Sequence, residues 1–521
     1  MTGVNSPLAE IPTDRADAAG RQWEPTLQHV TELHELYLSY EAAGRRHEGR
    51  PFLLQALSIG GGSSACTEAL SRAQLSLARD HLKLGDVSHA FATLDRVRTG
   101  IDLESDNPMV LWVAATEAQM LLTLGRANEV LRRGATTLGR LRADAGLLRT
   151  SQAADTFVLA MGEAALAVGD VAMANALVDM CGGAETRPDD ACAVGALRSQ
   201  IDIACGRLRE ARWRTSHLLS PENSTFESRT RLHQIQAELE LWSGESANAL
   251  EISRQALYDI ADADDKGSAG NVLNLAMRAC ADLHQVGVSQ RANRTVRVAN
   301  KAAGEIRQMA DSLNPVETVM HSSSVVADAV VTEWQAELAR FQQLPHAVGW
   351  WHAAAGSWET LGRPHRAAYA RWRQAQALLE RGDRPGAVDN LAHAWRQAIH
   401  HDPLRSSIRE FARAAGPSRT RTTAGSAAPQ PNPSPSGRSM APMSERVPSA
   451  PPEARPKLTV REGEVMHLVA EGLTSEQIGR RLGIAERTVR KHLSAVYGKA
   501  GLNGRAAAAA WWQRNEGQGL R

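Results

Sequence analysis

Near the C-terminus, basic and apolar residues recur with the spacing of two opposite faces of one helix. The polar set, at positions i, i+3, i+4 and i+7, is Arg487, Arg490, Lys491 and Ser494. The apolar set, at positions i, i+4 and i+7, is Val489, Leu493 and Val496. Residues at these separations share one side of an α-helix. Guanidinium and ammonium groups on an exposed helix face can bind phosphates and the edges of bases in a DNA major groove. The pattern therefore predicts either a DNA-binding helix or a basic face that is only solvated.

A second, shorter helix is predicted directly before the basic one. Thr474 and Gln477 form the T-x-x-Q pattern of a capping box. Ile478 and Leu482 give this helix an apolar stripe, and Gly483 can adopt the left-handed conformation that ends many helices. A basic helix that packs on a short helix across a tight turn is a helix-turn-helix.

Residues 457–521 resemble the DNA-binding domain of LuxR-type transcriptional regulators of bacteria. The residues that carry this resemblance before the helix-turn-helix are Leu458, Thr459, Arg461, Glu462, Glu464, Val465 and the run 470–474. Those within and after it are Ile478, Leu482, Thr488, Val489, His492, Leu493, Lys499 and Gly501. Sigma-factor DNA-binding regions share the first three helices, but the pair His492–Leu493 and a fourth helix over residues 505–512 favour the LuxR type. The resemblance implies a four-helix domain.

The resemblance also implies roles for individual residues. Arg490 and Lys491 are expected to face base edges, with Ser494 one turn further along. The residues expected to contact phosphates are Arg487, Thr488, Lys499, Thr474 and Ser475. The family usually has a capping serine where this chain has Ala485, which predicts a less stable start of the basic helix.

The fourth helix of this domain has two possible roles. In the family this helix often mediates dimerisation, and residues 505–513 could pair two copies of the chain. Alternatively, Trp511 and Trp512 could close the core of the small domain. The sequence leaves both roles open.

Before residue 416 the chain predicts a series of helical hairpins. Alanine follows five positions after each of the glycines Gly85, Gly169, Gly206, Gly244, Gly287, Gly362 and Gly382, and Gly125 with Val130 is a near match. Glycine permits a tight turn, and a small residue early in the next helix lets helices approach closely, as in the tetratricopeptide repeat, which this region resembles. Residues 26–415 are expected to form a tetratricopeptide-like α-solenoid with a concave surface, in which one turn signature between Gly287 and Gly362 is lost. Residues 1–25 are expected to be poorly ordered.

The end of this region, residues 347–415, resembles the end of the helical-repeat region in large ATP-binding LuxR-type regulators. The sequence contains no G-x-x-x-x-G-K-[ST] motif, so the nucleotide-binding domain of those proteins is not expected here. Residues 60–64, GGGSS, lack the phosphate-binding lysine and are expected to form a loop. Residues 416–456 hold ten of the 22 prolines and predict a disordered linker.

Charge and composition limit the possible functions. Residues 457–521 contain eleven Lys or Arg against six Glu, whereas the whole chain has a net charge of +1. This asymmetry favours a nucleic-acid contact at the C-terminal end. Five cysteines without a C-x-x-C pair, no secretory signal and no long apolar segment predict a cytoplasmic protein without a membrane span. No catalytic arrangement or metal-ligand spacing stands out, so we expect no enzyme, no cofactor and no metal.

Aromatic residues of the repeat region could line a ligand groove or fill the spaces between helices. The tryptophans concerned are Trp213, Trp242, Trp350, Trp351, Trp358, Trp372 and Trp395. For most of them we favour the core. His400 and His401 are expected to be solvated.

Together these patterns predict an all-α transcriptional regulator with a tetratricopeptide-like α-solenoid, a disordered linker and a four-helix LuxR-type helix-turn-helix domain. The expected partners are double-stranded DNA, a second copy of the chain on DNA, and RNA polymerase. The helical-repeat domain is expected to sense a small molecule or to bind a protein or peptide. The alternative is a solenoid scaffold or adaptor for a protein or peptide, with auxiliary DNA binding.

Overall fold

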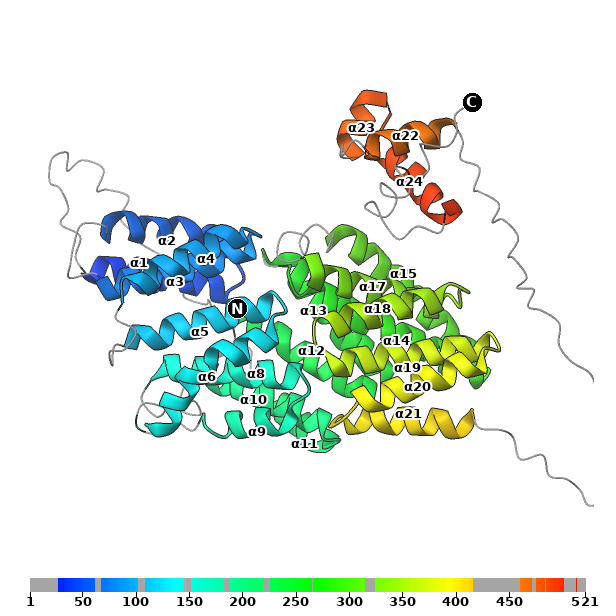
Figure 1. Ribbon diagram of the computed structural model, residues 1–521, viewed down its shortest axis with the longest axis horizontal. Coiled ribbons are helices and arrows are strands. Elements are labelled where there is room, and N and C mark those ends of the chain that lie inside the picture. Colours follow the sequence, from blue (N-terminus) through cyan, green and yellow to red (C-terminus); the bar gives the residue numbers. More distant parts are fainter. Residues whose placement is uncertain are drawn as a thin grey trace, which may run out of the picture. The chain divides into compact units, whose positions relative to one another are not determined.

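The computed structural model divides the chain into two compact units, residues 1–420 and 421–521 (Figure 1). The residues that it describes are 27–60, 67–101, 108–144, 146, 151–181, 188–218, 225–264, 266–313, 324–415, 460–470, 475–482, 484–500 and 512. Every regular element in these ranges is a helix, which confirms the all-α prediction. The predicted N-terminal segment (1–25) and linker (416–456) lie outside the described residues, as does most of the GGGSS stretch.

The first unit is built from helical hairpins joined end to end. Those of its first half are α1 (Leu27–Ala42) with α2 (Arg46–Gly60), α3 (Thr67–Lys83) with α4 (Val87–Thr99), α5 (Pro108–Thr123) with α6 (Ala127–Ala143), α8 (Gln152–Ala167) with α9 (Val171–Val178), and α10 (Pro188–Ala204) with α11 (Leu208–Leu218). Those of its second half are α12 (Phe226–Trp242) with α13 (Ser246–Asp262), α14 (Ala269–Ser289) with α15 (Asn293–Leu313), α17 (Ser324–Phe341) with α18 (Ala347–Thr360), and α19 (Pro364–Glu380) with α20 (Arg384–Gln397), followed by α21 (Asp402–Ala414). From α1 to α17, the first helix of each hairpin also contacts the first helix of the next. This is the arrangement of an α-solenoid.

Seven of the turns between helices share one backbone conformation; six lie within hairpins and one joins α18 to α19. Positive φ angles occur at Gly85, Gly125, Gly169, Gly206, Gly244, Gly362 and Gly382, which are seven of the predicted turn glycines. At each of them the amide of the following residue donates to the carbonyl five residues before it, as Asp86 does to His81 at 2.9 Å. This bond is the six-residue closure of a Schellman motif, and it satisfies a carbonyl that the helix end would leave unpaired.

Gly287 was predicted as a turn residue, and this prediction is wrong. Gly287 lies inside α14, which continues to Ser289, and Arg291 takes the left-handed conformation with φ 54°. The closing bond is still present, because the Ala292 amide donates to the Gly287 carbonyl at 2.8 Å. The missing turn between Gly287 and Gly362 lies at Gln343, whose φ is 53°.

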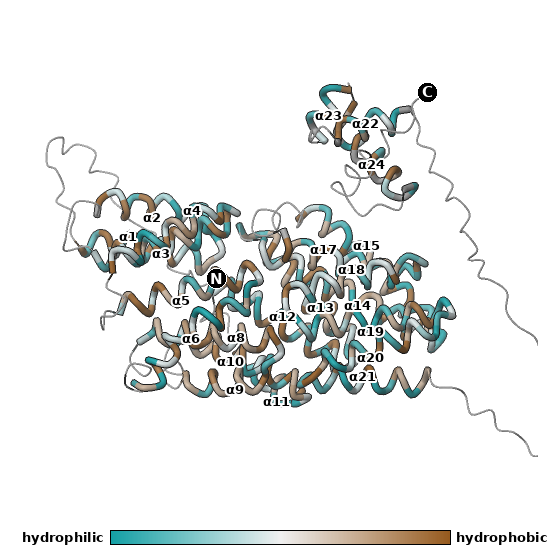
Figure 2. The backbone as a smooth tube through the Cα atoms, viewed as in Figure 1, coloured by the Kyte–Doolittle hydropathy of each residue, from teal (hydrophilic) through white to brown (hydrophobic). Residues whose placement is uncertain are grey.

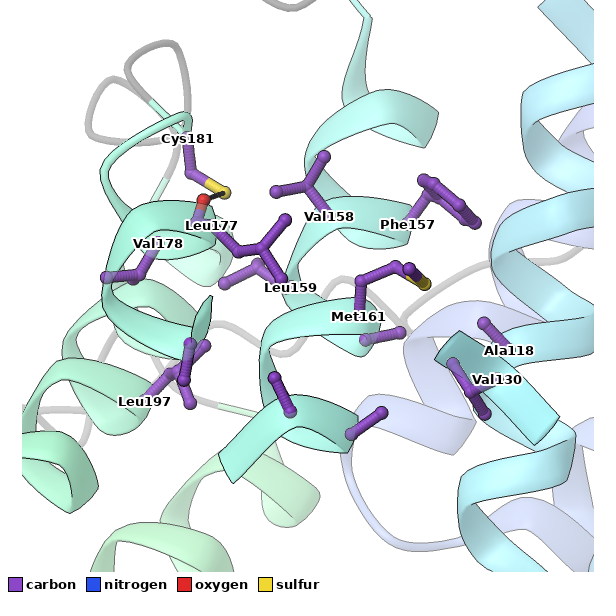
Figure 3. Close-up of a cluster of buried hydrophobic side chains, with 14 of the residues drawn as sticks. Ala118, Val130, Phe157, Val158, Leu159, Met161, Leu177, Val178, Cys181 and Leu197 are labelled. Carbon is purple, nitrogen blue, oxygen red and sulfur yellow. Dashed lines mark hydrogen bonds between the residues drawn. The ribbon is translucent and has the colours of Figure 1, made fainter. Parts of the chain in front are cut away.

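The small residues five positions after the turn glycines lie in the interior. All of those that follow the seven confirmed turns are buried: Ala90, Val130, Ala174, Ala211, Ala249, Ala367 and Ala387. Around them, larger apolar side chains fill the spaces between helices, and brown and teal residues alternate along the helices in Figure 2. Figure 3 shows the largest such cluster, where Phe157 and Met161 of α8 lie among residues of α5, α6, α9 and α10.

The two halves of the first unit also meet at the turns. The Gly44 carbonyl accepts a bond from the Asp264 amide at 2.9 Å, and the Asp264 carboxylate accepts one from the His47 amide at 2.8 Å. A side chain at Gly125 would lie 2.6 Å from Val326. Glycine is therefore required at position 125 for its positive φ and for the close approach of the second half.

The tryptophans mostly follow the prediction of a packing role. Trp351, Trp358 and Trp372 are buried, and the half-buried Trp242, Trp350 and Trp395 pack against the same cluster as Trp351. Trp213 is the exception, with 62% of its surface exposed.

The prediction that His400 and His401 are both solvated is half wrong. His400 is exposed and has a positive φ of 63°. The His401 ring is buried against Trp242 and His365, because it caps α21 from inside the fold by accepting the Leu404 amide.

In the part of the chain that the structure describes, no helix is long and apolar enough to span a membrane.

Candidate nucleic-acid interface

The C-terminal unit contains the predicted helix-turn-helix. Its described helices are α22 (Val460–Ala470), α23 (Ser475–Leu482) and α24 (Glu486–Ala500). Val489, Leu493 and Val496 of α24 are buried against Ile478 of α23 and the apolar face of α22. The apolar spacing in the sequence thus corresponds to the face of α24 that packs inward.

The turn between α23 and α24 is closed by a backbone bond. The Ile484 amide donates to the Gly479 carbonyl at 3.0 Å, the six-residue closure also seen in the solenoid turns. Gly483 itself lies outside the described residues. Ala485 precedes α24, and its carbonyl accepts the Thr488 and Val489 amides at 2.8 and 3.3 Å. With no side-chain oxygen at position 485, the first amides of α24 lack the cap that serine would supply.

The residues predicted to contact DNA differ in how far the structure describes them. Arg487, Thr488 and Lys491 are exposed on α24, whereas the neighbouring Val489 is fully buried. Ser475 is half-buried at the start of α23. The side chains of Arg490 and Ser494, and the whole of Thr474, lie outside the described residues. Arg487, Lys491 and Thr488 thus place two cations and a hydroxyl on the solvent side of α24.

Lys499 has a partner within the unit that the sequence did not reveal. Its ammonium donates to both carboxylate oxygens of Glu462 at 2.7 and 2.6 Å, which ties the end of α24 to α22. Glu462 is buried, while Lys499 keeps 39% of its side chain exposed. The phosphate contact predicted for Lys499 stays a prediction, and it would have to share the ammonium with this ion pair.

Arg461 is a second residue whose role the sequence did not predict. One of its nitrogens donates to the Leu482 carbonyl at 2.7 Å, at the last residue of α23. That carbonyl has no partner within its own helix, so the bond caps α23 and fixes it to α22. Such long-range caps leave no periodic signal in a sequence.

The predicted fourth helix is described only at Trp512, which is helical and packs on the buried cluster of the unit. A side chain at Gly463 of α22 would lie 3.6 Å from the Trp512 ring. For Trp512 this contact supports the role of closing the core. The rest of residues 505–513, and with them the dimerisation alternative, lie outside the described residues.

Comparison with known proteins agrees with this geometry. Residues 456–512 match the model of the bacterial regulatory proteins, luxR family. The spore germination protein GerE of Bacillus subtilis (strain 168) is 41% identical over 56 residues, which cover 11% of this chain and 76% of GerE. The chain belongs to the LuxR family. The nitrate/nitrite response regulator protein NarL of Escherichia coli (strain K12) is 42% identical over 55 residues, 11% of this chain and 26% of NarL.

The family model matches residues of the C-terminal unit, and the chain spans about a quarter of the length of NarL. In this LuxR-family protein the exposed side of α24 offers guanidinium and ammonium donors, which suit phosphates and the guanine edge. Among the described residues of both units, no group of three or more His, Cys, Asp or Glu side chains could hold a metal ion.

Proposed function

We propose that the protein is a sequence-specific DNA-binding transcriptional regulator that acts in the cytoplasm and is not an enzyme. The observation that carries the proposal is α24, which is buried on its Val489 face and exposes Arg487, Thr488 and Lys491 on the other. A helix of this kind, supported by a preceding helix, can enter a major groove with its exposed residues against the bases.

The proposal also covers the partners of the protein on DNA and the effector of the solenoid. One helix-turn-helix contacts few base pairs, so useful specificity normally requires two copies on adjacent half-sites. We infer that the protein binds DNA as a homodimer and contacts RNA polymerase there. The helical repeats bind the effector, a small molecule or a protein or peptide.

Selection of sequences from a random duplex pool by the full-length protein tests the proposal. An enriched inverted repeat is expected, and fluorescence anisotropy should show tighter binding to the whole repeat than to one half-site. Lys491→Ala should weaken this binding, whereas Lys301→Ala should not, because Lys301 is an exposed residue of α15 in the other unit. A pool without enrichment, or equal binding by both variants, would leave the solenoid as a scaffold for a protein or peptide.

A further inference from the structure

The second half of the solenoid encloses a cluster of ion pairs, which we call the arginine cluster: Arg278, Asp282, Glu337, Arg340, Tyr369 and Arg373. The Asp282 carboxylate accepts bonds from Arg340 at 2.7 Å and from Arg373 at 3.0 Å. Glu337 accepts from the Arg340 Nε at 2.8 Å and from the Tyr369 hydroxyl. The three arginines hold the pKa of Asp282 at about 2, although burial acts in the opposite direction. The Asp282 carboxylate therefore stays charged at neutral pH.

Two arginines of the cluster keep donors that the cluster does not use. A guanidinium has five N–H donors. In addition to Asp282 and Glu337, Arg340 donates to the Arg278 carbonyl at 3.2 Å, so three of its nitrogens are engaged once each. Arg373 likewise donates to Asp282, to the Tyr369 hydroxyl at 3.0 Å and to the Gln376 side chain at 3.0 Å. Each guanidinium therefore retains capacity for a further acceptor.

Arg340 and Arg373 form part of the wall of a pocket between α14, α17, α18 and α19. The pocket has a volume of about 430 Å³, within the range of small-molecule sites. Asp282 and Glu337, which the two arginines bind, are not among the residues that line it. The only carboxylate among its lining residues is that of Glu380, which is exposed to solvent. An occupant would therefore meet guanidinium groups at the buried part of the wall.

The rest of the pocket wall combines apolar residues with polar ones, among them His284, Gln343 and Arg381. Its accessible apolar residues include Leu344, Pro345, Val348 and Ala377, whereas the lining residue Trp351 is itself fully buried. A bare inorganic anion would leave this surface in contact with water, whereas a molecule that joins an anionic group to an apolar body would cover it. Burial of apolar area is favourable in proportion to the area removed from water, and a carboxylate accepts two parallel bonds from one guanidinium.

We propose that this pocket binds a small organic acid, with its carboxylate at Arg340 and Arg373 and its apolar body against Leu344, Pro345 and Val348. The proposal rests on the proposed function, because it names the ligand class and the place at which the solenoid receives its effector. A second hollow of about 250 Å³ shares Gln285, Gln376 and Glu380 with the pocket and extends to Phe411 of α21. A bound acid would contact α14, α17, α18 and α19 at the same time. It would therefore stabilise the arrangement in which these four helices form the pocket.

Calorimetric titration of the full-length protein tests the proposal with matched pairs of probes. Phenylacetate and hexanoate should each bind roughly tenfold or more tightly than phenylacetamide and hexanamide, because only the acids form charge-assisted bonds. Acetate and inorganic phosphate, which have no apolar body, should bind more weakly than both acids. Acids that bind no better than their amides, or that show no binding at millimolar concentration, would overturn the proposal. Phosphate binding as tight as that of the acids would also overturn it.

Two variants locate the binding. Ala377→Phe fills the pocket and should abolish acid binding. Gln285→Glu places a negative charge at an exposed residue of the wall and should weaken acid binding several-fold. Gln290→Glu makes the same change just after α14 at a residue that does not line the pocket, and it should bind acids like the wild type. Thermal unfolding shows whether each variant is folded. Wild-type binding by a folded Gln285→Glu and Ala377→Phe would place the ligand elsewhere.

Anisotropy on the selected operator separates this inference from the proposed function. An acid that binds and shifts DNA affinity supports both. If an acid binds without changing DNA affinity, the pocket is still a binding site for organic acids, but it is not the effector site. Absence of DNA binding would refute the regulator proposal, while the calorimetry and the two variants would still decide whether the pocket binds organic acids.

Discussion

Lys499, near the end of α24, donates its ammonium to both oxygens of the buried Glu462 carboxylate in α22. The two residues are separated by 37 positions in the sequence, so the pair joins helices that local propensity alone would leave independent. It fixes the direction of α24 relative to α22. The exposed side of α24 is therefore oriented by Glu462, a residue outside the helix-turn-helix.

Replacing the carboxylate should loosen α24. Glu462→Gln leaves the shape of the side chain but removes its charge, and it should cost ~1–3 kcal/mol of local stability, as charged hydrogen bonds do. Hydrogen exchange of peptides from α22 and α24 in the full-length protein measures this cost. Glu464→Gln is the matched control, since Glu464 is an exposed partner of Arg461 on the same helix, and it should change exchange little. Equal protection in both variants would contradict the role of the pair.

The solenoid turns make a second prediction, which separates backbone strain from steric overlap. Gly382→Ala, with φ 82° and open space around the position, should cost only the ~1–2 kcal/mol of a left-handed alanine. Gly125→Ala has a similar φ of 76° and also places a methyl group 2.6 Å from Val326 and 2.9 Å from Leu361. The overlap should add ~1–3 kcal/mol. Urea unfolding of the two variants tests this difference, and equal midpoints would show that the halves separate at little cost.

These turns also show how far the fold could be predicted from the sequence. Glycine is the residue that adopts a positive φ without strain, so the offset between each glycine and the next small residue located seven of the turns between helices. The same reasoning failed at Arg291, Gln343 and His400, where other residues adopt that conformation. Gly44 was missed because the small residue five positions later is Gly49, not alanine.

The candidate sites divide in the same way. The helix-turn-helix was predictable because its two faces follow a local period of 3.6 residues. The arginine cluster was not, because Arg340 and Arg373 reach Asp282 across 58 and 91 positions of sequence. No local period connects such residues, and only the packing of α14, α17 and α19 brings them together.

Acid should destabilise the solenoid through two buried histidines. Burial, with Arg72 and Arg79 nearby, lowers the pKa of His34 to about 4, although Glu41 acts in the opposite direction. Burial, with His365 and Arg278 nearby, lowers the pKa of His401 to about 3. The unfolded chain therefore takes up these protons near pH 6.5, whereas the folded protein does so only near pH 3–4.

The contribution of these histidines to the free energy of unfolding is complete above pH 6.5. It is lost as the pH falls, by about 1.4 kcal/mol per pH unit for each histidine. Urea unfolding between pH 7 and pH 4.5 measures the slope. His401→Gln should make the slope shallower, whereas His393→Gln, at an exposed position of α20, should leave it unchanged. An identical slope in His401→Gln would show that this ring does not resist protonation.

Substitution of two arginines of α24 by alanine should affect DNA binding in different ways. Arg490 is expected at a base edge. Arg490→Ala should therefore weaken DNA binding by ~1–3 kcal/mol and relax the preference at one base pair. Arg487, exposed near the start of α24 and expected at a phosphate, should on the same change weaken all sequences alike. It should also reduce the dependence of affinity on salt by about one released counterion. Anisotropy with the full-length protein on the selected site and on single-base variants, at several salt concentrations, distinguishes the two effects. If Arg490→Ala kept both affinity and base preference in a folded protein, the side of α24 that meets the bases would have to be reassigned toward Lys491 and the start of the helix.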